Sequence, residues 1–234
     1  MDSNARVAAA KCFERRPARP RHARRYAHPS LLEEVYRQQL IAAELLSFDA
    51  DVLCLQEVTG TMFRTYLEPH LWERGGYRGV YTPKCGSVPE GCALFYRESR
   101  FRPLRGGVEA VRLRDFLDEP AMHEAVFAPF FRRHCSTKAE TEAGRKVLTK
   151  LSTVAQIAAL ETVGEGGGEI LWVVNTHFFF HPDAPHARTL HAAVLLEAVR
   201  RRAAAADDAA DDDAVPAEER LPPALVLCGD LNST

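Results

Sequence analysis

The sequence predicts an α/β fold, and three features of the chain carry that prediction. Segments with apolar residues at helical spacing alternate with short apolar runs of strand length. Polar residues follow several of these runs directly, as they do where the strand ends of an α/β sheet carry a ligand site. The composition, with 46% hydrophobic and 26% charged residues over 234 residues, is that of a globular protein. It excludes a disordered chain, a collagen-like chain and a disulfide-rich miniprotein.

The first half of the chain alternates helix and strand. A helix is predicted over residues 29–48, with Ser30 as its N-cap and Glu33 completing a capping box. A buried strand is predicted over residues 49–57, and a second helix follows Thr59. Three further strands are predicted over residues 77–81, 92–96 and 101–104.

The second half continues the alternation. Residues 115–150 have helical character, which two prolines, at positions 120 and 129, are expected to interrupt. Strands are predicted over residues 152–163 and 169–176, and the glycine cluster between them predicts a hairpin, because a phosphate cradle needs a helix directly after it. The last predicted elements are a helix over 188–202, a low-complexity Ala/Asp loop at 203–220 and a buried strand over 225–228.

The charges are concentrated in two peripheral segments, although the net charge is only −2. Residues 1–29 form a basic extension that we expect to be flexible, whereas the loop at 203–220 is acidic. The six cysteines include no Cys-x-x-Cys pair, which gives no support for a zinc site and favours an intracellular compartment, cytoplasmic or mitochondrial. Apolar runs fall far short of the roughly 20 residues of a membrane-spanning helix, so no membrane partner is expected.

Polar clusters stand directly after three of the predicted strands. Glu57 ends the first strand, His177 closes an Asn-Thr-His motif, and Asp230 and Asn232 belong to a Gly-Asp-x-Asn motif. Each signal alone is weak, because a lone glutamate at a strand end is usually solvated, a lone histidine is usually structural, and Gly, Asp and Asn favour turns. Their joint occurrence after buried strands predicts that the four side chains converge on one site.

The four residue types suit a hard cation and a phosphate. Glu57 offers the oxygen ligands that Mg²⁺ prefers. Asp230 can orient or deprotonate an attacking water, and Asn232 can donate a hydrogen bond to phosphoryl oxygens in the transition state. His177 can contact a phosphate oxygen or help to move a proton.

These motifs also carry a family resemblance. Leu-Gln-Glu-Val at 55–58, Asn-Thr-His at 175–177 and Gly-Asp-Leu-Asn-Ser at 229–233 resemble, in this order, the endonuclease/exonuclease/phosphatase superfamily. Glu-Gly-Cys-Ala-Leu-Phe-Tyr-Arg at 90–97 is similar to its deadenylase-related branch. Asn-Thr-His-Phe-Phe-Phe-His-Pro at 175–182 most resembles the 2′-phosphodiesterases, which degrade 2′,5′-oligoadenylate and poly(A), and Nocturnin and Angel-type proteins remain open as alternatives.

The resemblance covers residues 26–234 and implies a two-sheet α/β sandwich with helices outside it. It implies Mg²⁺-dependent hydrolysis of phosphodiester bonds in RNA, by a phosphodiesterase or 3′-exoribonuclease that acts on oligoadenylate or poly(A). The residue roles that it implies are Glu57 as metal ligand, His177 as the phosphate-contacting histidine, and Asp230 with Asn232 as the catalytic pair.

Two parts of the family pattern are not matched, so we expect residues 30–234 to form a partial family domain, incomplete at both ends. No apolar strand leads to an early metal-site asparagine, although Asn4 lies at about the expected distance before Tyr36. The family's later Asp and Ser-Asp-His motifs would lie beyond Thr234, which leaves the activity of this chain open. Two alternatives are a catalytically dead pseudo-nuclease that binds RNA or a protein, and a phospholipid or inositol-phosphate hydrolase on the same fold.

Overall fold

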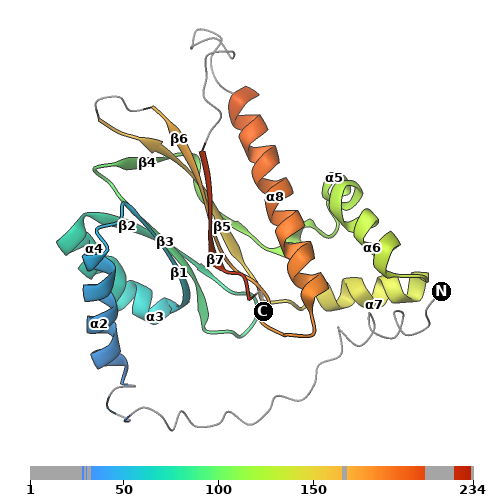
Figure 1. Cartoon of the computed structure of the whole chain (residues 1–234), viewed down its shortest axis with the longest axis horizontal. Helices are drawn as coiled ribbons and strands as arrows, with labels where there is room; N and C mark the ends of the chain where they lie inside the picture. The colour runs from blue at the N-terminus through green and yellow to red at the C-terminus, as the bar shows by residue number, and fades with distance from the viewer. Residues whose placement is uncertain (1–27, 29, 31–32, 165–167, 209–223, 233–234) are drawn as a thin grey trace.

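A computed structural model describes residues 28, 30, 33–164, 168–208 and 224–232. Two β-sheets face each other, and helices cover the outer face of each sheet (Figure 1). The predicted two-sheet α/β sandwich is therefore confirmed. Nearly all of the basic extension at 1–29, including Asn4, lies outside the described residues.

The first sheet has the strand order β1-β3-β2, and all of its neighbouring strands are antiparallel. Its strands are β1 (Val52–Thr59), β2 (Tyr77–Pro83) and β3 (Glu90–Arg97). The outer face of this sheet is covered by α2 (Glu34–Ser47) and by a helical run of α3 (Gly60–Met62), a π-helical turn (Phe63–Leu67) and α4 (Glu68–Gly75).

The second sheet has the order β4-β5-β6-β7, in which only the β6–β7 pair is parallel. Its strands are β4 (Phe101–Val111), β5 (Ala155–Thr162), β6 (Ile170–His177) and β7 (Ala224–Asp230). Its outer face carries a 3₁₀ turn (Leu113–Phe116), α5 (Pro120–Met122), a π-helical turn (His123–Phe127), α6 (Ala128–His134), α7 (Lys138–Leu148) and α8 (Pro185–Asp208). Within the described part of the chain, none of the helices combines the length and apolar character needed to cross a membrane.

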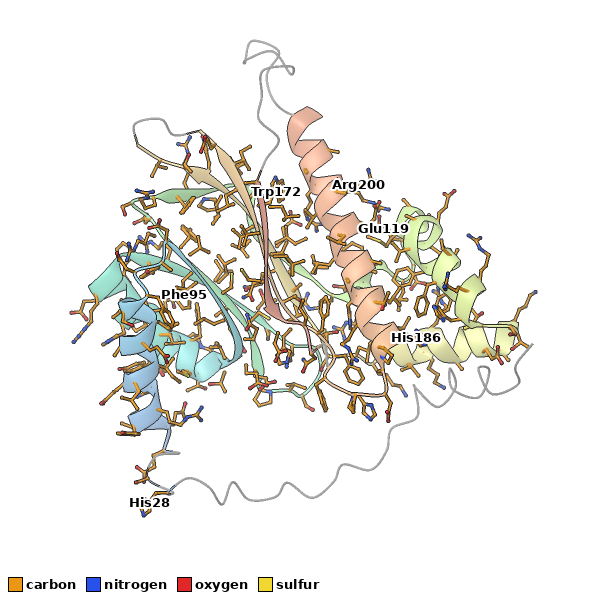
Figure 2. The ribbon with its side chains drawn as sticks, in the orientation of Figure 1. His28, Phe95, Glu119, Trp172, His186 and Arg200 are labelled. Carbon is orange, nitrogen blue, oxygen red and sulfur yellow. The ribbon has the colours of Figure 1, made fainter. Side chains whose placement is uncertain are left out.

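Three apolar clusters hold the layers together. Leu94 of β3 and Val173 of β6 belong to the cluster between the two sheets. Phe95 of β3 points the other way, into the cluster beneath α2 and α4, and Trp172 of β6 lies in the cluster beneath α8 (Figure 2). Successive residues of one strand thus face opposite layers, as the period of a β-strand requires.

The first predicted helix forms, but its predicted N-terminus is wrong. Helix α2 begins at Glu34, and Glu33 takes the N-cap position without a capping hydrogen bond from its side chain. The hydroxyl of Ser30 is instead 2.8 Å from Nδ1 of His28. This local contact competes with the capping box that the sequence pattern predicts. The predicted helix after Thr59 is confirmed, and the Thr59 hydroxyl accepts a hydrogen bond from the backbone N–H of Met62.

Two other helix predictions need correction. Pro120 begins α5, where its missing N–H is harmless, but Pro129 does not interrupt the helix, because a π-helical turn directly precedes α6 and the helical run continues through it. The loop predicted at 203–220 is wrong for residues 203–208, which extend α8. Alanine has the highest helix propensity, so the Ala-rich stretch prolongs the helix. Residues 209–223 lie outside the described part.

All four predicted strands of the second sheet form, but β4 continues to Val111, past its predicted end at residue 104, and β7 differs in burial. Strands β5 and β6 pair as the predicted hairpin, and Gly164 and Gly168 adopt positive φ angles of 101° and 103° at its turn. Strand β7 forms, but the prediction that it is buried is wrong: Leu225 and Val226 are 46% and 44% exposed. The reason is its place at the edge of the sheet, where, among the described residues, β6 is its sole strand partner.

Candidate functional site

Glu57 lies on a bulge near the end of β1. The pairing of β1 with β3 shifts register between Leu55 and Val58, and Glu57 has a φ of +58° within that irregularity. The left-handed region costs a non-glycine residue roughly 1–2 kcal/mol. Bulges redirect side chains, and backbone strain of this kind is concentrated at functional sites. The local structure therefore points to a specific use for the exposed Glu57 carboxylate.

The bulge brings Glu57 to two further ionisable residues. One potential ligand atom each from Glu57, Glu90 and His177 lies within 4.8 Å of the others. Glu90 is the first residue of β3 and pairs with Thr59 in the antiparallel register, which places it beside the end of β1. Two carboxylates and an imidazole form a donor set that fits a divalent cation, since carboxylate oxygens are the ligands that Mg²⁺ prefers.

Sequence reasoning missed Glu90 as a site residue. The predicted site residues stand at or just after the ends of strands, whereas Glu90 opens one. In an antiparallel pair, the start of one strand lies beside the end of its neighbour. Recognising that β1 and β3 pair antiparallel would therefore have placed Glu90 next to Glu57.

Lys84 is a second residue that the sequence did not single out. Its ammonium Nζ lies 2.6 Å from Oε1 of Glu90, and its side chain is only 10% exposed. The backbone N–H of Lys84 also donates to the carbonyl of Glu90 at 3.0 Å, so the two residues are joined twice. Lys84 thus places a largely buried positive charge at the edge of the carboxylate cluster.

His177 belongs to this cluster and also approaches Asp230. It ends β6, is buried, and pairs in register with Asp230 of the parallel strand β7. Its Nε2 is 3.9 Å from Oδ2 of Asp230, and its Nδ1 has no hydrogen-bond partner among the described residues. Burial, and next the charge of Lys84, lower the pKa of His177, although Asp230, Glu57 and Glu90 oppose the shift. The imidazole is therefore neutral near pH 7, with a nitrogen free to bind a ligand or accept a proton.

The Gly-Asp-x-Asn motif forms a tight turn at the end of β7. The Asn232 backbone N–H donates to Oδ1 of Asp230 at 2.9 Å, and its side-chain Nδ2 donates to the carbonyl of Phe178 at 2.8 Å. The Phe178 N–H in turn donates to the Asp230 carbonyl at 2.9 Å. These bonds fix the Asp230 carboxylate so that one oxygen is held by the turn and the other faces His177.

Gly229 is required by the same turn. It has a φ of +151°, and a Cβ atom there would come within 2.0 Å of the backbone oxygen of Thr176. A side chain at position 229 would therefore push β7 away from β6. The glycine sets the approach of the two strands that carry His177 and Asp230.

The four predicted residues thus lie at one end of the two sheets, close to the end of β7 (Figure 1). The charges of Glu57 and Asp230 both act on the pKa of His177. Asn232 is held through the Asp230 turn and Phe178. Glu90 and Lys84 complete the group on the β3 side.

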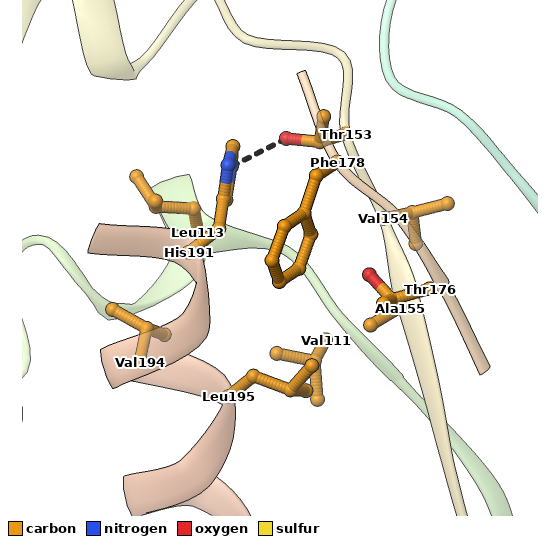
Figure 3. A pocket seen from close by; sticks show the side chains of 10 residues that line it. All are labelled: Val111, Leu113, Thr153, Val154, Ala155, Thr176, Phe178, His191, Val194 and Leu195. Carbon is orange, nitrogen blue, oxygen red and sulfur yellow. Dashed lines mark hydrogen bonds between the residues drawn. The ribbon is translucent and has the colours of Figure 1, made fainter. Parts of the chain in front are cut away.

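A small cavity of about 20 Å³ lies behind this site, in the core under α8 (Figure 3). Its wall includes His191, whose Nε2 is 2.5 Å from the Thr153 hydroxyl. Burial lowers the pKa of His191 to about 4, so this histidine is neutral and serves the packing of α8. The cavity has room for about one water molecule and is no substrate pocket.

Comparisons with known proteins identify the family of the chain. The profile of the Endonuclease/Exonuclease/phosphatase family matches residues 25–234. The chain is 32% identical over 209 residues to the 2′,5′-phosphodiesterase 12 of Homo sapiens, covering 89% of this chain and 30% of that protein. It is 24% identical over 218 residues to the 3′-5′-exoribonuclease subunit Ccr4 of the CCR4-Not complex of Saccharomyces cerevisiae, covering 89% of this chain and 23% of that protein.

Solved structures have the same fold. The crystal structure of ANGEL2, a 2′,3′-cyclic phosphatase, in complex with adenosine-2′,3′-vanadate aligns with a TM-score of 0.61 at 26% identity, covering 92% of this chain and 49% of that one. The human Nocturnin catalytic domain aligns with a TM-score of 0.59 at 23% identity, covering 88% of this chain and 59% of that one. The chain spans only about 30% of the length of the phosphodiesterases that it matches.

Proposed function

Because the chain belongs to the endonuclease/exonuclease/phosphatase family, we propose that it provides a site for hydrolysing phosphodiester bonds in RNA, with oligoadenylate or poly(A) as substrate. The family membership confirms the resemblance predicted from the motifs. Relatives named as a 2′,5′-phosphodiesterase and a 3′-5′-exoribonuclease support an RNA substrate. The observation that carries the proposal is the convergence of Glu57, Glu90 and His177 within 4.8 Å, with Asp230 beside His177.

The donor set supports a magnesium ion as cofactor. Glu57 and Glu90 would hold it through carboxylate oxygens, and the unpartnered Nδ1 of buried His177 adds to the fit. A bound ion of this kind supplies a Lewis acid that polarises a phosphoryl oxygen. Lys84 adds a fixed positive charge that attracts the substrate phosphate to the same place.

The remaining residues orient the reactants and move protons. Asp230, held by the Asn232 N–H, is the group that orients or deprotonates the attacking water. His177 is neutral near pH 7 and contacts a phosphate oxygen or accepts a proton. One hydrogen of the Asn232 side-chain amide is donated to the carbonyl of Phe178. The second hydrogen is left for a phosphoryl oxygen.

Release of AMP from oligoadenylate by the full-length gene product tests the proposal. We expect Mg²⁺-dependent hydrolysis that Glu57→Gln lowers about 100-fold, because removing a group that holds the reacting centre costs rate to that order. Glu73→Gln on the exposed face of α4 is the matched control and should leave the rate unchanged. Equal rates in the wild type and the Glu57→Gln variant would remove Glu57 from the site.

A second substrate deserves a parallel assay, because ANGEL2, at 26% identity, is described as a 2′,3′-cyclic phosphatase. Hydrolysis of a 2′,3′-cyclic phosphate end, without release of AMP from oligoadenylate, would favour that activity. Tight binding of RNA without turnover at saturating Mg²⁺ would instead support the pseudo-nuclease alternative. Hydrolysis of phosphoinositides in preference to RNA would move the substrate class to phospholipids.

A further inference from the structure

A buried polar network lies directly beneath the candidate site. The side chain of Asn175, on β6, accepts a hydrogen bond at Oδ1 from Nε2 of Gln56 on β1, at 2.7 Å. Its Nδ2 faces three acceptors: the carbonyls of Leu55 and Ala93, at 3.2 and 3.0 Å, and Oε1 of Gln156, at 3.0 Å. One side chain of the second sheet thus contacts two strands of the first.

The network is fully paired inside the core. Asn175 and Gln156 are both 0% exposed. Gln156 continues the network to β2, where its Nε2 donates to the carbonyl of Val80 at 2.9 Å and to Oγ1 of Thr82 at 3.0 Å. A buried amide without partners is costly, so a network of this kind holds its members in one arrangement.

The network meets β1 at the bulge that carries Glu57. Leu55 and Ala93 form the last regular pair of β1 and β3 before the register shifts, and Asn175 donates to the carbonyls of both. Gln56, the next residue, donates to Asn175 and also to the carbonyl of Cys54 at 3.1 Å. The residues immediately before Glu57 are therefore fixed from the second sheet.

The same side chain is linked to His177 by strand geometry. Asn175 and His177 are two residues apart on β6, so their side chains lie on one face of the sheet. From this juxtaposition we infer that Asn175 and Gln56 are positioning residues, which hold the strained Glu57 bulge at a fixed place relative to His177. The inference rests on the proposed function, since it assigns the network to the metal-holding side chains.

A purely structural role would make a different prediction. If the network only fastens the two sheets, its loss lowers stability and leaves the site of the folded protein unchanged. If it positions Glu57, its loss also frees the bulge and weakens metal binding by roughly 10- to 100-fold, as outer-shell partners of metal ligands do.

The test compares Gln56→Met with Thr153→Val. The first removes the amide that reaches Asn175 and keeps the shape of the side chain, and the second removes a buried hydrogen bond to His191 outside the network. Hydrogen exchange of residues 52–59 is measured in metal-free protein, and Mn²⁺ affinity is measured by electron paramagnetic resonance. Gln56→Asn, which keeps the amide but shortens its reach, replaces Gln56→Met if that variant does not fold.

We expect Gln56→Met to speed exchange in residues 52–59 and to weaken Mn²⁺ binding about tenfold or more, whereas Thr153→Val changes neither. Wild-type exchange and wild-type Mn²⁺ affinity in a folded Gln56 variant would overturn the inference. Failure of the proposed function looks different: Mn²⁺ then binds equally to the wild type and to Glu57→Gln, or to neither. In that case the exchange data alone decide whether the network holds the bulge.

Discussion

Nε2 of His177 lies 3.9 Å from Oδ2 of Asp230, and the parallel pairing of β6 with β7 sets that separation. The distance is too long for a hydrogen bond, so none joins the two side chains directly. His177 also forms a cluster of potential ligand atoms with Glu57 and Glu90. The histidine is therefore the residue at which the ends of β1, β3, β6 and β7 meet.

Burial is the main cause of the lowered pKa of His177, and the charge of Lys84 adds to it. Lys84→Met removes the Lys84 charge, so the pKa of His177 should rise. As the pH falls, the imidazole should then take up its proton at a higher pH than in the wild type. NMR titration of the imidazole measures the shift. Lys150→Met, at an exposed position, is the control and should leave it unchanged. No rise in Lys84→Met would contradict the placement of Lys84 at the site.

His191 makes the fold sensitive to acid. Its pKa is lowered to about 4 in the folded protein, from an ordinary value of 6.5. Below pH 6.5, His191 is protonated in the unfolded chain but stays neutral in the folded chain. The free energy of unfolding is therefore greatest above pH 6.5 and falls as the pH drops towards 4. From pH 7.5 to pH 5 this one group should cost about 2 kcal/mol of unfolding free energy.

Urea unfolding at these two pH values tests that effect. The difference in unfolding free energy between them should shrink by about 2 kcal/mol in His191→Gln, which cannot titrate. A neutral glutamine keeps a polar group near the Thr153 hydroxyl, so the fold is retained. An unchanged pH dependence would show that folding does not lower the pKa of His191.

Gly229 is expected to tolerate no side chain. In Gly229→Ala the added Cβ would meet the Thr176 oxygen at 2.0 Å, at a φ of +151° that L-residues rarely adopt. The substitution should cost roughly 2–4 kcal/mol of unfolding free energy, measured by urea denaturation. Gly86→Ala is the matched control, because Gly86 also has a positive φ but no atom lies within 4 Å of its Cβ position. Equal losses of unfolding free energy in both variants would show that the positive φ alone causes the effect. The close approach of β7 to β6 would then not be what requires Gly229.

Local patterns in the sequence predicted most of the fold. Apolar runs and helical spacing located every strand of both sheets, because these signals depend on neighbours along the chain, but β4 continues to Val111, past its predicted end at residue 104. The exceptions depended on competition between local interactions. Ser30 bonds to His28 and not to the helix end, and alanines extend α8 into the predicted loop.

The sequence did not predict which strands pair with one another or which lie at a sheet edge. Leu225 to Cys228 read as a buried strand from hydrophobicity, but β7 lies at a sheet edge and is largely exposed in the described structure. Glu57, His177, Asp230 and Asn232 stand at or just after the ends of strands and were predicted as site residues for that reason. Glu90 joins them only through the antiparallel register of β1 and β3.

Titration of the metal-free protein with Mn²⁺, followed by electron paramagnetic resonance, tests most directly whether Glu57 and Glu90 hold one divalent ion beside His177. The predicted result is one bound ion per chain, with an affinity that falls about tenfold or more in Glu57→Gln and in Glu90→Gln and is unchanged in Glu73→Gln. Wild-type affinity in both of the first two variants, or no binding by the wild type, would contradict a metal site at these residues.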